Sequence, residues 1–125
     1  MLIILGNQID EIQSKVLGSF YASYVKGAIS WEKFCELTEA NRRMFISDYA
    51  LLFEAAIKGG LKIQGRELYQ VDRLISLGLL QNQNRLGGNV WMEITDNPDK
   101  QNDIIVTSLG MTFYHNAPST LKMDI

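Results

Sequence analysis

The residue types that most often carry nucleophilic chemistry are scarce in this chain, which contains one cysteine, Cys35, and one histidine, His115. A cysteine nucleophile needs a base and an orienting partner close to it, so these two residues would have to converge from distant parts of the sequence. The local sequence favours other roles. Cys35 lies beside Phe34 within a predicted helix and is interpreted as a small buried hydrophobe. His115 is interpreted as a surface residue near a helix C-terminus.

The number and spacing of potential ligand residues do not indicate a metal site either. A structural zinc ion needs about four cysteine or histidine ligands, and this chain has two such residues, which excludes structural zinc within one chain. The carboxylates of Asp96, Asp99 and Asp103 fall close together at spacings that suggest calcium. They lack the full calcium-loop pattern with its closing glutamate, so we interpret the segment as a solvated turn.

The glycine pairs give no sign of a phosphate or dinucleotide site. Gly59-Gly60 and Gly87-Gly88 match neither fingerprint, and they fit the end of a helix and a hairpin turn, respectively. Acid-base catalysis by Glu54 or Glu93 would require a burial that the sequence does not reveal. We therefore expect a protein that is not an enzyme and has no cofactor and no metal.

Length, composition and charge predict one cytoplasmic domain spanning 1–125. The 125 residues are 46% hydrophobic, the net charge is −2, and a single cysteine fits a reducing compartment. The apolar run 1–5 is shorter than the core of about 7 to 15 residues in a signal peptide, and no stretch approaches the roughly 20 apolar residues of a membrane span. We expect no membrane association, and binding to nucleic acid would need a local patch of positive charge.

Helical spacing of apolar residues predicts three helices in the first half of the chain. The first covers about 8–26 and ends at Gly27, and the second is capped by Ser30 and runs to about Arg42. Ser47 is a suitable cap for a third, which is apolar on nearly all sides and stops at Gly59-Gly60. An apolar helix of this kind belongs at the centre of a core.

The second half alternates between helix and strand patterns. A fourth helix is predicted from Gly65 to Gly78, strands over 79–85, 90–95 and 103–107, and a short helix from Ser108. The fold class is thus α+β: an N-terminal helical pair (1–46) is packed on a module of helix, helix, three-stranded β-wing and short C-terminal helix (47–115). Residues 116–125 are predicted to form a flexible tail.

Two short steps in this module carry a resemblance. The segment 68–80 (LYQVDRLISLGLL) ends a helix with a leucine-glycine-leucine step, and 105–113 (IVTSLGMTF) begins one with threonine, two residues and glycine. Together they resemble the second half of a winged helix-turn-helix domain, over about 47–115. The resemblance implies a hairpin wing after the fourth helix. The chain departs from that pattern between Gly60 and Gly65, where there is no room for the usual intermediate helix, so a helix of the N-terminal pair would have to replace it.

Positive charge is concentrated in this module: residues 58–90 hold five basic and two acidic residues. Arg66, Gln70 and Arg73 stand one and two helical turns apart, with Tyr69 alongside, and form a stripe suited to phosphates and base edges. The predicted nucleic-acid contacts are Lys62, Arg66, Gln70, Arg73 and Arg85. The alternative is that the stripe is simply the solvated face of an amphipathic helix.

Binding of a specific duplex DNA site would favour a homodimer, and the long N-terminal helices supply candidate residues for its interface. Four aromatic residues exceed what one apolar stripe needs: Phe20, Tyr21, Tyr24 and Trp31. The alternative is that they belong to the core. The first functional hypothesis is therefore a DNA-binding regulator. The second is a protein-interaction adaptor or inhibitor, such as a phage or defence accessory factor, which binds a protein partner through the same module.

Overall fold

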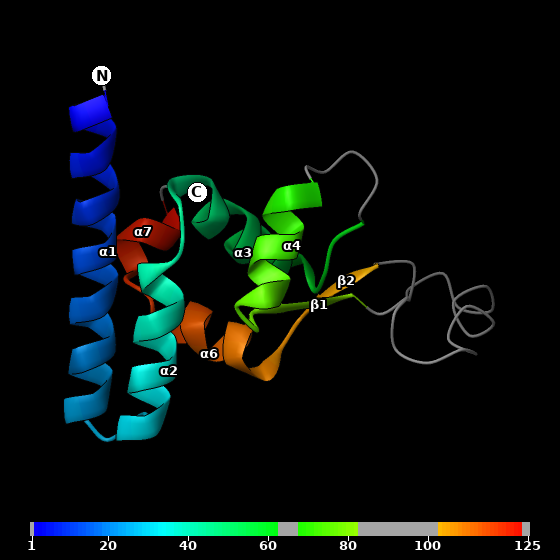
Figure 1. The fold of residues 1–125 in the computed structure, drawn as a ribbon. Coiled ribbons are helices and arrows are strands. Elements are labelled where there is room, and N and C mark those ends of the chain that lie inside the picture. Colours follow the sequence, from blue (N-terminus) through cyan, green and yellow to red (C-terminus); the bar gives the residue numbers. More distant parts are fainter. Residues whose placement is uncertain (1, 63–67, 83–102, 124–125) are drawn as a thin grey trace.

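The computed structural model describes residues 2–62, 68–82 and 103–123. Within them the chain forms six helices and a two-stranded antiparallel sheet, so the predicted α+β class is confirmed. Figure 1 shows an N-terminal helical hairpin at one side of the molecule, with the remaining helices and the sheet packed beside it. None of the helices in the described ranges is long and apolar enough to cross a membrane.

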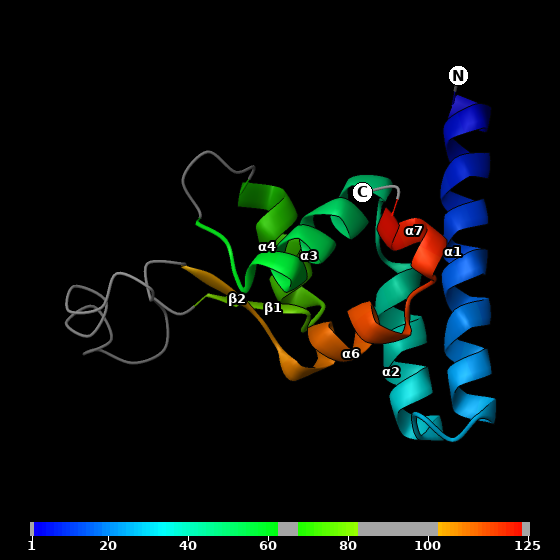
Figure 2. The same ribbon diagram turned by 180° about the vertical axis from the view of Figure 1, so that it is seen from behind.

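Helices α1 (Leu2–Val25) and α2 (Trp31–Arg42) form an antiparallel hairpin. The turn between them depends on Gly27, whose φ of 82° is the left-handed conformation that glycine adopts without strain. The hydroxyl of Ser30 caps α2 by accepting a hydrogen bond from the Lys33 N–H at 3.0 Å, as predicted. Both views in Figures 1 and 2 place α1 at the outer edge of the molecule, with α2 on one side of it.

Helix α3 (Ile46–Lys58) is the centre of the core, and it ends as predicted at Gly59, whose φ is 78°. It begins before Ser47, the predicted cap. The carboxylate of Asp48 instead accepts a hydrogen bond from the Phe45 N–H at 2.9 Å. The side chains that α3 and its neighbours bury completely include Phe20, Leu37, Leu52, Phe53, Ala55, Leu74, Leu79, Ile104 and Phe113.

Helix α4 (Leu68–Ser76) leads into strand β1 (Leu80–Asn82), which pairs with strand β2 (Ile104–Val106). A separate antiparallel bridge joins Leu61 to Ile104. The predicted start of α4 and the predicted strand at 90–95 lie outside the described residues. A three-stranded wing is therefore not shown, and the sheet of the described residues has two strands.

The two short sequence steps described above meet at one corner of the fold. Thr107 precedes helix α6 (Ser108–Asn116), and its hydroxyl accepts from the Gly110 N–H at 2.9 Å and donates to the Gly78 carbonyl at 2.5 Å. A Cβ atom added to Gly110 would lie 2.2 Å from the carbonyl oxygen of Leu79. The hydrogen bonds of Thr107 therefore hold the connection between α4 and β1 against the first turn of α6.

The C-terminal residues are packed on this core, in contrast to the predicted flexible tail. Residues Ser119–Met123 form helix α7, Ala117 is buried, and Leu121 packs against the core. The ammonium group of Lys122 lies 4.8 Å from the ring centre of Tyr114. Pro118 and the polar neighbours suggested an unfolded end, but the apolar contacts of Leu121 and Ala117 order this segment.

A buried polar network ties the hairpin to α3. The Gln13 side-chain amide donates to the backbone carbonyl of Asn41, in the last turn of α2, at 3.2 Å and to that of Met44, just beyond it, at 3.1 Å. The Asn41 amide donates to the Gln13 carbonyl at 3.0 Å, and its oxygen accepts from the hydroxyl of Tyr49. Burial and the nearby Asp48 carboxylate raise the pKa of Tyr49, so its hydroxyl stays a neutral donor. One network thus contacts α1, α2 and α3.

Candidate interaction surfaces

The predicted nucleic-acid contacts are only partly described. Arg66 and Arg85 lie outside the described residues, and Lys62 is exposed beside the Leu61 bridge. Gln70 and Arg73 are both on α4, as predicted. Their side chains, however, turn to the N-terminal end of α3, where the Gln70 amide donates to the Ser47 hydroxyl at 2.9 Å. The stripe is therefore in part an internal contact between two helices.

Arg73 is the clearest correction to the predicted exposed stripe. Its Nε and Nη2 atoms each lie 2.7 Å from a carboxylate oxygen of Asp48, and the two side chains are 25% and 0% exposed. The guanidinium carbon also lies 4.6 Å from the ring centre of Phe45. The hydrogen bond with Asp48 raises the pKa of Arg73. Its charge is neutralised by this pair, and the guanidinium supports the fold instead of standing free at the surface.

This pairing was not visible in the sequence. Asp48 has the usual signature of a first-turn acidic residue, which interacts with the N-terminal end of its own helix. Its second partner, Arg73, is 25 residues away in the sequence. The pairing depends on how α4 packs on α3, and neither the periodicity of the helices nor their caps specify that packing.

A cluster of four aromatic rings stands at the closed end of the α1–α2 hairpin. Tyr24 and Phe34 each lie 5.3 Å from Trp31 between ring centres, and Tyr21 lies 6.0 Å from Phe34. Trp31 is 57% exposed and Tyr21 is 55% exposed. We call these four residues, Tyr21, Tyr24, Trp31 and Phe34, the aromatic cluster. The cluster exposes ring surface to solvent, whereas large aromatic side chains in folded proteins are mostly buried.

The predicted dimer residues divide between this cluster and the core. Phe20 is completely buried, and its ring meets that of Phe113 edge-on at 4.9 Å. It therefore drops out of the predicted interface. Phe34 is not among the predicted interface residues, but it joins the cluster because it follows Trp31 by three positions on α2 and so lies on the same face of that helix.

The outer face of α1 continues the cluster along the helix. Ser14, Leu17, Gly18 and Val25 are all exposed, and they share this face with Tyr21. The segment 16–25 contains no charged residue. A solvent-facing helix normally carries charges on its exposed side, as α1 does in its middle with the exposed ion pair of Glu11 and Lys15. Beyond that pair the exposed side is uncharged up to Val25, and the exposed Leu17, Tyr21 and Val25 mark a contact surface. We call it the outer α1 face.

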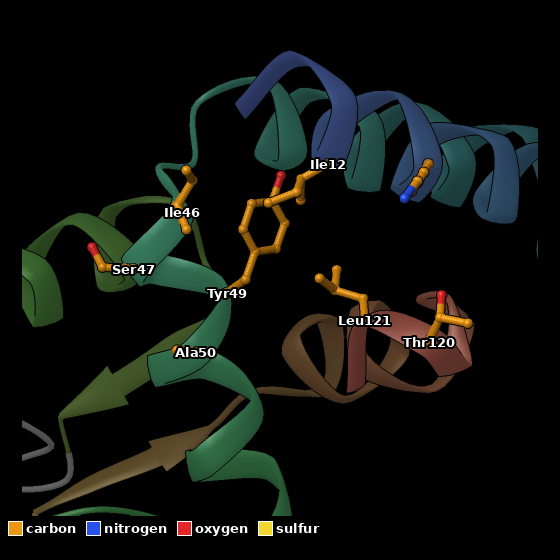
Figure 3. Close-up of a pocket in the computed structure, with 8 residues that line it drawn as sticks. Ile12, Ile46, Ser47, Tyr49, Ala50, Thr120 and Leu121 are labelled. Atoms are coloured by element: carbon orange, nitrogen blue, oxygen red, sulfur yellow. The ribbon is translucent and has the colours of Figure 1, made fainter. Parts of the chain in front are cut away.

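A pocket of about 370 Å³ lies between α1, α3 and α7. Figure 3 shows Ile12, Tyr49 and Leu121 directed into the same space from these three helices. The Tyr49 hydroxyl is already paired with Asn41, and the other polar residues that line the pocket are Lys15, Ser47 and Thr120. The pocket has no constellation of acid, base and nucleophile.

The residues considered for chemistry are placed apart from this pocket. Cys35 is exposed on α2, which corrects its predicted burial, because the buried side of α2 is formed by Leu37, Ala40 and Asn41. His115 is exposed in the last turn of α6, as predicted. Asp96 and Asp99 of the acidic turn, and Glu93, lie outside the described residues. Among the residues that the structure does describe, no three potential ligands gather in a way that would hold a metal ion.

Comparison of this chain with protein-family models, with curated proteins and with solved structures finds no match.

Proposed function

We propose that this chain is a non-enzymatic binding module of winged-helix-like fold, an adaptor or inhibitor that binds a protein through its α1–α2 hairpin. The observation that carries the proposal is the aromatic cluster with Tyr21 and Trp31 more than half exposed, continuous with an uncharged outer α1 face. Aromatic residues are enriched at the centres of protein interfaces, and charged residues are depleted there.

The order of elements supports the winged-helix part of the proposal. Helix α3, the bridged residue Leu61, helix α4, the paired strands β1 and β2 and helix α6 follow one another as in such a module. The two paired strands are separated in the sequence by residues 83–102. The contact of Thr107 with the Gly78 carbonyl explains physically why the two resembling sequence steps occur together.

The exposed rings favour an interface over a purely structural role. Burying apolar surface contributes about 25 cal/mol per Å², so a large aromatic side chain left in water forgoes a substantial stabilisation. The core is filled without Tyr21 and Trp31, since Phe20, Leu37 and Phe113 close it beneath the hairpin. A partner that covers the two exposed rings would bury them without any change in the fold.

Site-specific photo-crosslinking tests this proposal. A benzophenone amino acid at position 21 is expected to crosslink a protein partner in an extract of the source cells, whereas the same group at position 72, an exposed site on α4, should not. Tyr21→Ser combined with Trp31→Ser should leave the melting temperature nearly unchanged and compete far less well for that crosslink. Equal crosslinking from positions 21 and 72 would contradict the proposal.

DNA binding is the second candidate, and it is favoured by the exposure of Tyr69 on α4 and of Lys62 next to the bridged Leu61. Anisotropy of a labelled duplex should then show binding that weakens steeply with salt. Lys62→Gln with Arg66→Gln should reduce affinity and salt dependence, while Lys33→Gln with Arg42→Gln on α2 serves as the matched loss of two surface charges. Arg73 is kept in this test because its removal would alter the fold. No binding at low salt would eliminate this candidate.

A further inference from the structure

We propose that the protein partner is a second copy of this chain, bound so that the two α1 helices cross antiparallel with the two-fold axis close to Gly18. This inference rests on the proposed function, since it names the partner for the same surface. It specifies which residues meet across the axis, and each contact can be tested separately.

The first argument is the open space above Gly18. Gly18 lies in the middle of the outer α1 face, and a Cβ atom added to it would meet nothing within 4 Å. Glycine inside a helix costs about 0.5 to 1 kcal/mol relative to alanine, so an exposed mid-helix glycine needs a reason. Close approach of another backbone supplies one, because the distance between packed helices depends on the side chains at the crossing point.

The second argument is charge complementarity about that residue. Asp10 and Lys26 are both exposed, and they stand eight positions before and after Gly18. In a two-fold interface each contact occurs twice, so an antiparallel crossing at Gly18 places the Lys26 ammonium of each chain opposite the Asp10 carboxylate of the other. A parallel crossing would instead place like charges together. The opposed helix dipoles favour the antiparallel direction as well.

The third argument is the length of α1. Its 24 residues make a helix of about 36 Å at about 1.5 Å per residue, and Gly18 lies toward its C-terminal end. An antiparallel crossing there carries the N-terminal half of the partner's α1 past the closed end of the hairpin, where the aromatic cluster is exposed. The cluster and the outer α1 face therefore belong to one continuous interface.

Crosslinking of purified protein at the axis tests the geometry. Gly18→Cys in a Cys35→Ser background is expected to give a covalent dimer with a short bis-maleimide, because the two cysteines meet on the axis. Asp72→Cys in the same background is the matched control on α4 and should stay monomeric. Sedimentation of the unmodified chain should show a monomer–dimer equilibrium. A monomer at every concentration, or equal crosslinking of the two variants, overturns the inference.

Charge reversal tests the direction of the helices. Lys26→Glu should weaken the dimer about tenfold, since two contacts turn repulsive, and adding Asp10→Lys should restore it. Failure of the double variant to recover would exclude the antiparallel pairing. If the purified chain is monomeric while position 21 still crosslinks a different protein in the extract, the second copy is excluded and the proposed function stands. If that crosslink is absent too, both proposals fail.

Discussion

Replacing Gly110 with alanine is expected to lower the free energy of unfolding by about 3 kcal/mol or more. The new Cβ atom would lie 2.2 Å from the Leu79 carbonyl oxygen and 2.6 Å from a methyl carbon of Val106. The closer atom is backbone and has no rotamer that relieves the overlap, so α6 must move away from the α4–β1 connection. Such a shift also strains the two hydrogen bonds of the Thr107 hydroxyl. Urea denaturation followed by circular dichroism measures the loss.

Gly18→Ala is the matched control for this substitution. It also adds one methyl group to a helical glycine, but the site is open. At low protein concentration we expect it to stabilise the chain by about 0.5 to 1 kcal/mol through helix propensity. Equal effects at the two positions would show that the corner between α6 and the α4–β1 connection is not packed as described.

Arg73→Ala is expected to cost about 3 kcal/mol, since it leaves the Asp48 carboxylate buried with no cation beside it. The loss should shrink in an Asp48→Asn background, where no charge remains to be compensated. A double-mutant cycle from the four unfolding free energies gives the coupling, which we expect to be about 2 kcal/mol. Additive effects of the two substitutions would argue against the paired geometry.

The control for Arg73 is Arg42→Ala. Arg42 also contacts a carboxylate, Glu39, through two nitrogen atoms, but both side chains are exposed. The pair lowers the pKa of Glu39, yet water screens it, and we expect little change in stability. The two ion pairs have similar contacts but differ in burial, so the difference in their loss of stability measures the effect of burial. If an Arg73 variant lost DNA binding, the loss could therefore arise from the destabilised fold and would not identify Arg73 as a DNA contact.

The N-terminal hairpin was the most predictable part of the fold. The bounds and cap of α2 follow from Ser30 and the apolar spacing after it, and Gly27 marks the turn. The start of α1 at Leu2 was missed, since the first turns of the helix show no clear amphipathic period. The C-terminal tail was misjudged for a different reason. Pro118 and its polar neighbours predict a flexible tail from composition, whereas the structure packs Leu121 against the core.

The candidate surfaces were only half predictable. The sequence singles out Tyr21, Tyr24 and Trp31, together with Phe20, as an aromatic surplus. Only the packing of Phe113 against Phe20 in the folded chain separates Phe20 from the other three and places it in the core. Gln70 and Arg73 had the right spacing on the right helix. Spacing fixes which residues share a face, and it does not fix whether that face meets water or another helix.

The sequence by itself determined the bounds of α2, the glycines at which α1 and α3 end, which residues share a helix face, and that the chain has an α+β fold. These features depend on local periodicity, caps and turns. The tertiary structure alone decided that Asp48 neutralises Arg73, that Gly110 must lack a side chain, and that Tyr21 and Trp31 remain exposed. Each of these depends on a contact between segments that are distant along the chain. The free energy of such contacts is set by packing and burial, which appear only when the helices are assembled.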